Sequence, residues 1–119
     1  VQALVTFTVH DYLARPGLRR FVMHLIESDA EMRASARSLS AAVVRALGAL
    51  LDSRRDEMGH PDPYKAAEFM HRMLFSTLDQ VALFHGESPT GTDLTEDEMA
   101  DQLGRAIRGY LRTTGTREG

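Results

Sequence analysis

Apolar residues recur along the chain at the three- and four-residue spacing of amphipathic helices, and no stretch shows the alternation of a strand. The most apolar of these stretches predicts a helix over residues 62–85. Asp62 is a good N-cap, and Pro63 fits the first helical position because its missing N–H would lack a partner there. Its polar side chains form only a narrow stripe, Glu68, Arg72 and Asp79. We therefore expect a central helix, buried in its own domain or shared with a partner chain.

Three helices are predicted before this central one. The first runs to about Ala14 and is stopped by Arg15-Pro16-Gly17, because Pro cannot continue a helix and Gly allows a reversal. The second spans the apolar repeat of residues 18–26. The third begins at Ser28-Asp29-Ala30-Glu31, which resembles a capping box, and runs to about Met58.

The last helix follows a polar loop from Gly86 to Asp93 that is rich in turn-forming residues. It is announced by a second capping box, Thr95-Glu96-Asp97-Glu98. Its apolar seam consists of Met99, Leu103, Ala106, Ile107, Tyr110 and Leu111. Small residues beside the seam, Ala100 and Gly104, would allow another helix to come close. Residues 113–119 are expected to fray, and the fold class is an all-α antiparallel bundle of about five helices.

Length and charge narrow the range of functions. The 119 residues form one domain by size, residues 1–119, and the absence of Cys excludes disulfides and thiolate metal sites. A net charge of -3 with scattered Arg argues against a nucleic-acid surface on this chain itself. We find no apolar run near the ~20 residues of a membrane span, so we expect a soluble, cytoplasmic domain with no membrane partner. Because Val1 is already in phase with an apolar stripe, we expect the chain to be the C-terminal part of a longer protein.

Evidence for catalysis or metal binding is sparse. Glu57 and His60, and Glu68 and His71, have the Glu-x-x-His spacing of carboxylate-bridged metal pairs, but no inward-facing carboxylates on other helices complete such a site. There is no Gly-x-Ser-x-Gly elbow and no Gly-rich phosphate loop. We therefore expect no enzyme activity, no cofactor and no metal, and we keep a helical metal protein or enzyme using Glu68 and His71 as the alternative.

Bulky, adaptable side chains are numerous on helices predicted to face one another, and Met in particular adapts to irregular ligands. They permit a lipophilic pocket among the first four helices. The candidate pocket residues are Phe7, His10, Tyr12, Phe21, Leu25, Leu47, Phe69, Met70 and Met73. His71 and Gln80 are further possible polar anchors. Plain core packing accounts for the same pattern, and the sequence does not separate a pocket from a filled core.

The order of these parts resembles the C-terminal domain of TetR-family transcriptional regulators. The resemblance rests on the Arg15-Pro16-Gly17 stop, the long third helix, Asp62-Pro63 with Ala66-Ala67, and a last helix closing on Arg108-Gly109-Tyr110-Leu111. It implies a regulator, expected to be a repressor, whose C-terminal domain binds a small hydrophobic effector. Operator DNA would be bound only through an N-terminal helix-turn-helix domain that this chain lacks.

The resemblance also implies a homodimer, because the last two long helices of this family pair with their counterparts as a four-helix bundle. Those helices would be the central and final ones here, which agrees with the apolar character of the central helix. The expected interface residues are Phe75, Leu78, Gln80, Leu83, Met99, Leu103, Ile107 and Tyr110. On this expectation, Leu103→Glu or Ile107→Glu should give monomers by burying an unpaired charge.

Overall fold

Helices form nearly all of the part of the chain that the computed structural model describes, residues 1–113. The α-helices are α1 (Gln2–Leu13), α2 (Pro16–Ser28), α3 (Ala30–Ser53), α4 (Pro63–Leu83) and α5 (Glu96–Thr113), and a short 3₁₀ helix, η1 (Arg55–Glu57), follows α3. No strand occurs within residues 1–113. The predicted all-α class with five helices is confirmed. The predicted frayed tail falls mostly on residues 114–119, which lie outside the described part.

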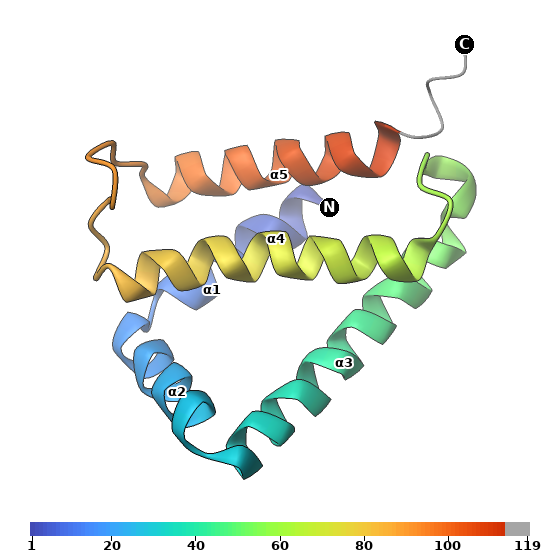
Figure 1. Ribbon diagram of the computed structural model, residues 1–119. Coiled ribbons are helices and arrows are strands. Elements are labelled where there is room, and N and C mark those ends of the chain that lie inside the picture. The colour runs from blue at the N-terminus through green and yellow to red at the C-terminus, as the bar shows by residue number, and fades with distance from the viewer. Residues whose placement is uncertain (114–119) are drawn as a thin grey trace.

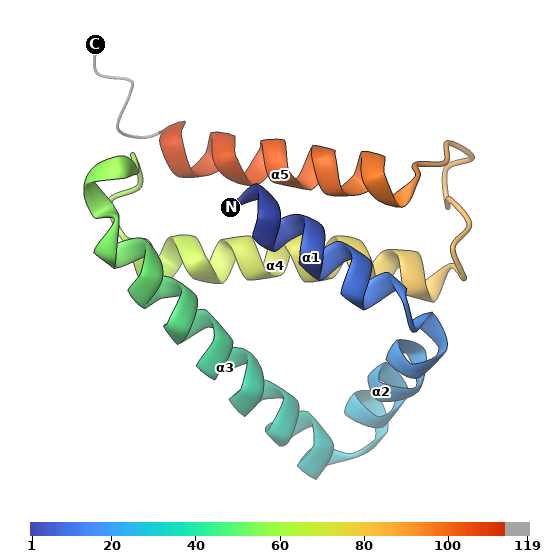
Figure 2. The same cartoon turned by 180° about the vertical axis from the view of Figure 1, so that it is seen from behind.

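The helices form a pair and a triangle (Figure 1). The antiparallel pair consists of α4 and α5, which run side by side in both views. From behind, α1 crosses this pair and packs most extensively on α5 (Figure 2). The triangle is made by α4, α2 and α3, with α3 meeting α4 near η1 and diverging from it toward α2. The core therefore sits where α1, α4 and α5 meet.

Most of the core comes from α4, as its all-round apolar sequence predicts, and from α5. Val5 and Val9 of α1 are almost fully buried against it. The other buried apolar residues of this cluster are Leu51, Ala66, Ala67, Met70, Leu74, Leu78, Ala100, Leu103, Ile107 and Leu111. Because α1 packs behind α4 and α5, it covers one side of each of these two helices, and that side is not available to a second chain.

Two predicted helix starts are confirmed by their capping hydrogen bonds. The Asp62 carboxylate accepts from the backbone N–H groups of Tyr64 and Lys65, at 3.1 and 3.2 Å. In the Thr95 box, the Thr95 hydroxyl accepts from Glu98 N–H, and the Glu98 carboxylate accepts from Thr95 N–H at 2.9 Å. Each cap satisfies backbone donors that have no partner inside the helix.

The predicted cap of α3 at Ser28 is wrong by one residue. Asp29 is the N-cap, and its carboxylate accepts from the N–H groups of Glu31 and Met32. The Ser28 hydroxyl instead donates to the carbonyl of His24, at 2.8 Å, in the last turn of α2. A carboxylate directly after the Ser takes over the cap, so the α2–α3 connection is tighter than the pattern predicts.

Other boundaries also shift. Pro16 is already the first residue of α2, where its fixed φ suits a helix start. The helical stretch predicted to reach Met58 ends at Ser53 and continues only as η1. At the far end, α4 stops at Leu83, and His85 has the left-handed φ of 55° that reverses the chain.

The close helix approach predicted at the small residues of α5 occurs within the chain. Gln2 of α1 lies against Gly104, where an added Cβ would overlap its side-chain amide. The same amide donates to the carbonyl of Ala100 at 3.2 Å. The small residues therefore admit α1 of the same chain.

One helix, α3, is long and apolar enough by length and composition to cross a membrane, which the sequence-based expectation missed. A single such helix is weak evidence, because helices of globular cores pass the same test. Here the helix is amphipathic. Leu51 is buried in the core, and Arg37 and Arg45 are exposed.

Candidate functional site

An apolar cavity of about 300 Å³ lies between α1, α3 and α4. Its lining residues are Leu4, Val5, Thr8, Val43, Ala46, Leu47, Leu50, Met70, His71, Leu74, Phe75 and Ile107. Only Thr8 and His71 among them carry polar side-chain atoms. The volume is at the lower end of the ~300–1,000 Å³ that small-molecule sites occupy.

The cavity exists because α3 diverges from α4 and leaves part of its apolar stripe uncovered. The Val43 and Leu50 side chains are 46% and 53% exposed, although they lie on the side of α3 that faces the cavity. On the opposite wall, Leu4 of α1 is 46% exposed. Apolar side chains that stay this open on facing helices are unusual in a packed core and mark a place where further apolar surface can bind.

His71 is the principal polar group of the cavity. Its ring lies 4.7 Å from the ring of Phe75, centroid to centroid, and forms no hydrogen bond within the described chain. Burial lowers the pKa of His71 below its usual value, while the nearby carboxylates of Glu68 and Asp79 oppose this shift. His71 is therefore neutral at pH 7 and presents one donor and one acceptor.

A polar cluster lies next to the cavity residue Phe75. The Tyr12 hydroxyl donates to Asp79, and the Arg19 Nε donates to both, at 3.1 Å to Tyr12 and 3.3 Å to Asp79. Burial, and then the bond to Asp79, raise the pKa of Tyr12 to about 12, so its phenol stays neutral. The ring of Tyr12 lies 6.1 Å from Phe75, which lines the cavity. The cluster joins α1, α2 and α4 at the edge of the cavity.

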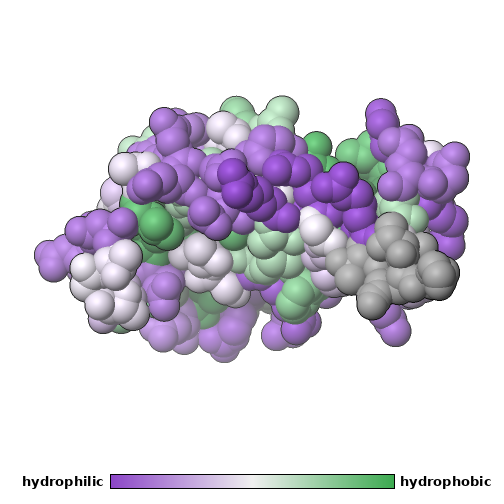
Figure 3. Space-filling view, turned by 90° about the horizontal axis from the view of Figure 1, so that it is seen from above, coloured by the Kyte–Doolittle hydropathy of each residue, from purple (hydrophilic) through white to green (hydrophobic). Residues whose placement is uncertain are grey.

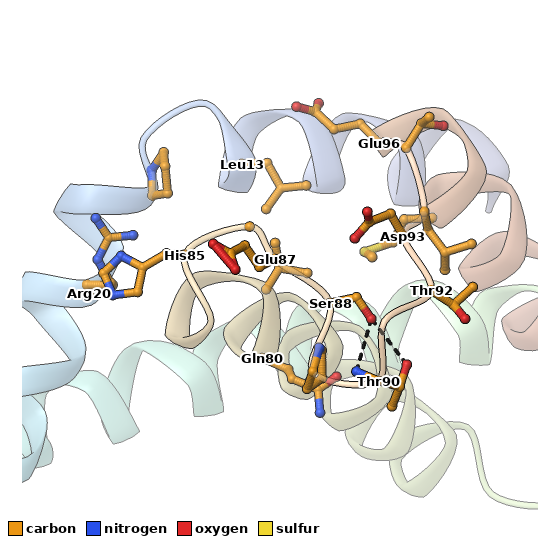
Figure 4. Close-up of a pocket in the computed structure, with 17 residues that line it drawn as sticks. Leu13, Arg20, Gln80, His85, Glu87, Ser88, Thr90, Thr92, Asp93 and Glu96 are labelled. Carbon is orange, nitrogen blue, oxygen red and sulfur yellow. Dashed lines mark hydrogen bonds between the residues drawn. The ribbon is translucent and has the colours of Figure 1, made fainter.

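A second, larger hollow of about 630 Å³ lies at the C-terminal end of α4 (Figure 4). It is formed by the α1–α2 turn, the C-terminal end of α4 and the loop that leads to α5. In the loop, the backbone N–H of Thr90 donates to the Ser88 hydroxyl at 3.1 Å. Glu87 and Asp93 contribute carboxylates and Arg20 a guanidinium, so this hollow carries charges of both signs, unlike the cavity at His71.

A third feature is the outer face of α4 and α5, on the side away from α1. We define it by residues at helical spacing on the two helices, Phe69, Ser76, Gln80, Leu83, Gln102, Ala106 and Tyr110. Phe69 and Leu83 are 48% and 60% exposed. Phe69 packs on Tyr110 with ring centroids 5.2 Å apart, and the Tyr110 hydroxyl bonds to His60 Nε2 at 2.9 Å. No described helix crosses this side of the pair, which faces the reader in Figure 1.

The neighbouring side of α5 is different. Hydrophilic side chains run over α5 when the molecule is seen from above (Figure 3). They include Asp101 and Arg105, which form an ion pair at 3.1 Å, and Arg112. This side of α5 is thus charged, whereas the outer face carries the exposed apolar side chains of Phe69 and Leu83.

The predicted pocket residues separate into groups in the structure. Leu47 and Met70 line the apolar cavity, and Tyr12 lies at its edge. Phe7 and Phe21 are 68% and 59% exposed and line neither cavity. The remaining members also lie outside the cavity lining: Leu25 and Met73 are half-buried, Phe69 is on the outer face, and His10 is exposed.

The His10 ring Nδ1 and the Glu96 carboxylate form a hydrogen bond of 2.8 Å, which connects α1 to the start of α5.

The predicted interface residues are divided as well. Leu83 and Tyr110 lie on the outer face, Gln80 is exposed there and also lines the second hollow, and Met99 is half-buried at that hollow. By contrast, Phe75 and Ile107 line the apolar cavity, and Leu78 and Leu103 are buried in the chain's own core. Sequence reasoning missed Leu4, Thr8, Val43, Ala46 and Leu50 as cavity residues. The apolar stripe of α3 was the available signal for Val43 and Leu50.

The metal alternative is not favoured. The Glu68 carboxylate accepts from Arg72 Nε at 2.6 Å, and it is therefore already paired beside His71. Among the described residues, no group of three or more His, Cys, Asp or Glu side chains is placed to hold a metal ion.

Comparison with known proteins gives one match. The family model described as "Tetracyclin repressor-like, C-terminal domain" matches residues 1–111, which is nearly the whole chain. No curated protein and no solved structure matches.

Proposed function

The chain belongs to the family of tetracyclin repressor-like C-terminal domains, and we propose that it is the effector-binding and dimerising domain of a cytoplasmic transcriptional repressor. Operator DNA would be bound by an N-terminal helix-turn-helix domain of the whole regulator. The chain's own net charge of -3 agrees with this division, because binding to phosphates requires a clustered basic face.

The observation that carries effector binding is the apolar cavity between α1, α3 and α4. Its walls are half-exposed Leu and Val side chains, including Leu4 and Val43, and its volume of about 300 Å³ suits a small lipophilic molecule. Burial of this open apolar surface by a ligand is favourable at roughly 25 cal/mol per Å².

Dimerisation is supported by the outer face of α4 and α5. Exposed Phe69 and Leu83 on α4 and the small Ala106 on α5 would let a second copy of the pair pack closely as a four-helix bundle. A two-fold axis would bring this same face together from both chains.

Regulation follows from the position of α4, which contributes His71 and Phe75 to the cavity and Phe69 and Leu83 to the outer face. An effector that binds one arrangement of α1, α3 and α4 better than another shifts the population toward it. Because α4 also carries the dimer contacts, this shift changes the relative placement of the two subunits and lowers operator affinity.

The first test is native mass spectrometry of the gently purified chain. We expect a mass of twice 13.2 kDa, with an added organic mass where an effector is retained. A monomer at all concentrations would reject the dimer.

Operator binding by the full-length regulator, measured with and without a ligand that binds the chain, tests the regulatory step. Unchanged operator affinity with every bound ligand would reject effector control.

A further inference from the structure

Within the described chain, the apolar cavity offers a ligand no charged side chain in its lining. No Asp, Glu, Lys or Arg lines it. The charged groups nearest to His71 are all paired: Glu68 with Arg72, and Asp79 with Arg19 and Tyr12. The segments contributed by α3 and α5 are apolar. A charged group placed inside the cavity would therefore lose hydration without gaining a counter-charge, which is unfavourable.

Two polar groups remain available to a ligand, and they are not equivalent. The Thr8 hydroxyl already donates to the carbonyl of Leu4, at 2.8 Å, within its own helix. The His71 ring has no hydrogen-bond partner in the described chain, and it lies against the ring of Phe75. His71 is thus the one lining side chain with an unused donor and acceptor, set in a wall that is otherwise apolar.

We propose that the cavity selects an uncharged, mainly apolar molecule with one hydrogen-bonding group, such as a hydroxyl or carbonyl, which binds His71. The inference rests on the proposed effector function and deepens it, because it names the class of effector. Fatty acids and hydrophobic amines fit the same walls by shape, but they should bind more weakly because the lining offers their charged groups no counter-charge. The apolar part of the ligand would lie along Leu4, Val43 and Leu50, whose exposed surface it would cover.

The test is isothermal titration calorimetry of the whole chain at pH 8 with three probes that share one tail: decanol, decanoate and decylammonium. We expect decanol to bind at least about tenfold more tightly than either charged probe, because no group compensates their desolvation. Tighter binding of decanoate or decylammonium would overturn the proposal. This ranking uses the unmodified protein and does not depend on the folding of any variant.

Variants then test the role of His71. His71→Leu should weaken decanol binding about five- to tenfold, the usual value of one net hydrogen bond. His24→Leu is the matched control, because His24 is exposed on α2 and lines neither cavity, and it should leave the affinity unchanged. Equal decanol affinity in the wild type and His71→Leu would overturn the anchor but leave the effector cavity standing. Failure of all three probes to bind the wild type would overturn the effector cavity itself, and the inference with it.

Discussion

Two neighbouring positions of α5 should respond in opposite ways to a charged substitution, and this separates folding from dimerisation. Ile107 is fully buried between α1 and α5, whereas Ala106 is exposed on the outer face. Ile107→Glu was expected from the sequence to give monomers. The structure changes that expectation, because the side chain is part of the chain's own core.

The magnitude follows from burial. Burying a carboxyl at position 107 would raise its pKa by roughly 3–5 units, so that the group takes up a proton near neutral pH. The cost at pH 7 is then set by the gap of ~2.7 units between pH 7 and the ordinary Glu pKa of about 4.3, and it amounts to about 3.5 kcal/mol. Loss of the buried Ile side chain adds roughly 1.5–3 kcal/mol. Since whole domains are stable by only about 5–15 kcal/mol, Ile107→Glu should leave the chain largely unfolded. At the exposed position, Ala106→Arg should change the free energy of unfolding of the monomer by no more than about 0.5 kcal/mol.

The assay combines thermal melting, followed by circular dichroism, with the mass in solution by analytical ultracentrifugation. We expect Ala106→Arg to keep its helix content and become monomeric, because a long cation blocks the close approach of a second α5. Ala41→Arg, on the exposed side of α3, is the matched control and should stay dimeric. An Ile107→Glu chain that melts like the wild type would refute the burial argument. A fully dimeric Ala106→Arg chain would refute the proposed face.

Three further predictions concern stability. Leu78→Ala should cost about 2–5 kcal/mol in urea unfolding, because Leu78 is fully buried; a cost below ~1 kcal/mol would contradict its place in the core. Because burial lowers the pKa of His71 from 6.5, the unfolded chain binds more protons, so stability should fall as the pH drops through 6.5. Urea unfolding of His71→Leu should show less of this loss, and an identical pH profile would exclude His71 as its source. Asp29→Ala should lower the free energy of unfolding by about 0.5–2 kcal/mol, and Ser28→Ala should lower it clearly less. The reverse order in thermal melts would show that Ser28 is the cap.

Local signals in the sequence determine most of the helix positions. The Asp62 cap and the Thr95–Glu98 box each join residues no more than three positions apart in the sequence, so the pattern alone locates them. The start of α3 shows the limit of such reasoning. Ser28 and Asp29 are both good capping residues, and only the path of the chain out of α2 decides that Asp29 accepts the N–H groups.

Assigning the faces of α5 required the three-dimensional structure. Periodicity shows that Leu103 and Ile107 are on the apolar side of α5, but it does not say which helix covers them. Here α1 of the same chain covers them, and Gly104 and Ala100 allow that approach. The surface left for a second chain is then one position away, at Ala106.

The same limit explains why the sequence could not separate a pocket from a filled core. Val43 and Leu50 have the spacing of core residues, and they would be core residues if α3 lay along α4 for its whole length. Instead α3 diverges from α4 and their side chains remain half-exposed. An apolar stripe in the sequence shows which residues of a helix gain free energy when they are buried. The angle between two helices then decides whether a neighbouring helix covers those residues or leaves them open to a ligand. His71 gains its significance in the same way, since a neutral imidazole without a partner is ordinary on a helix surface but becomes a selective group inside an apolar wall.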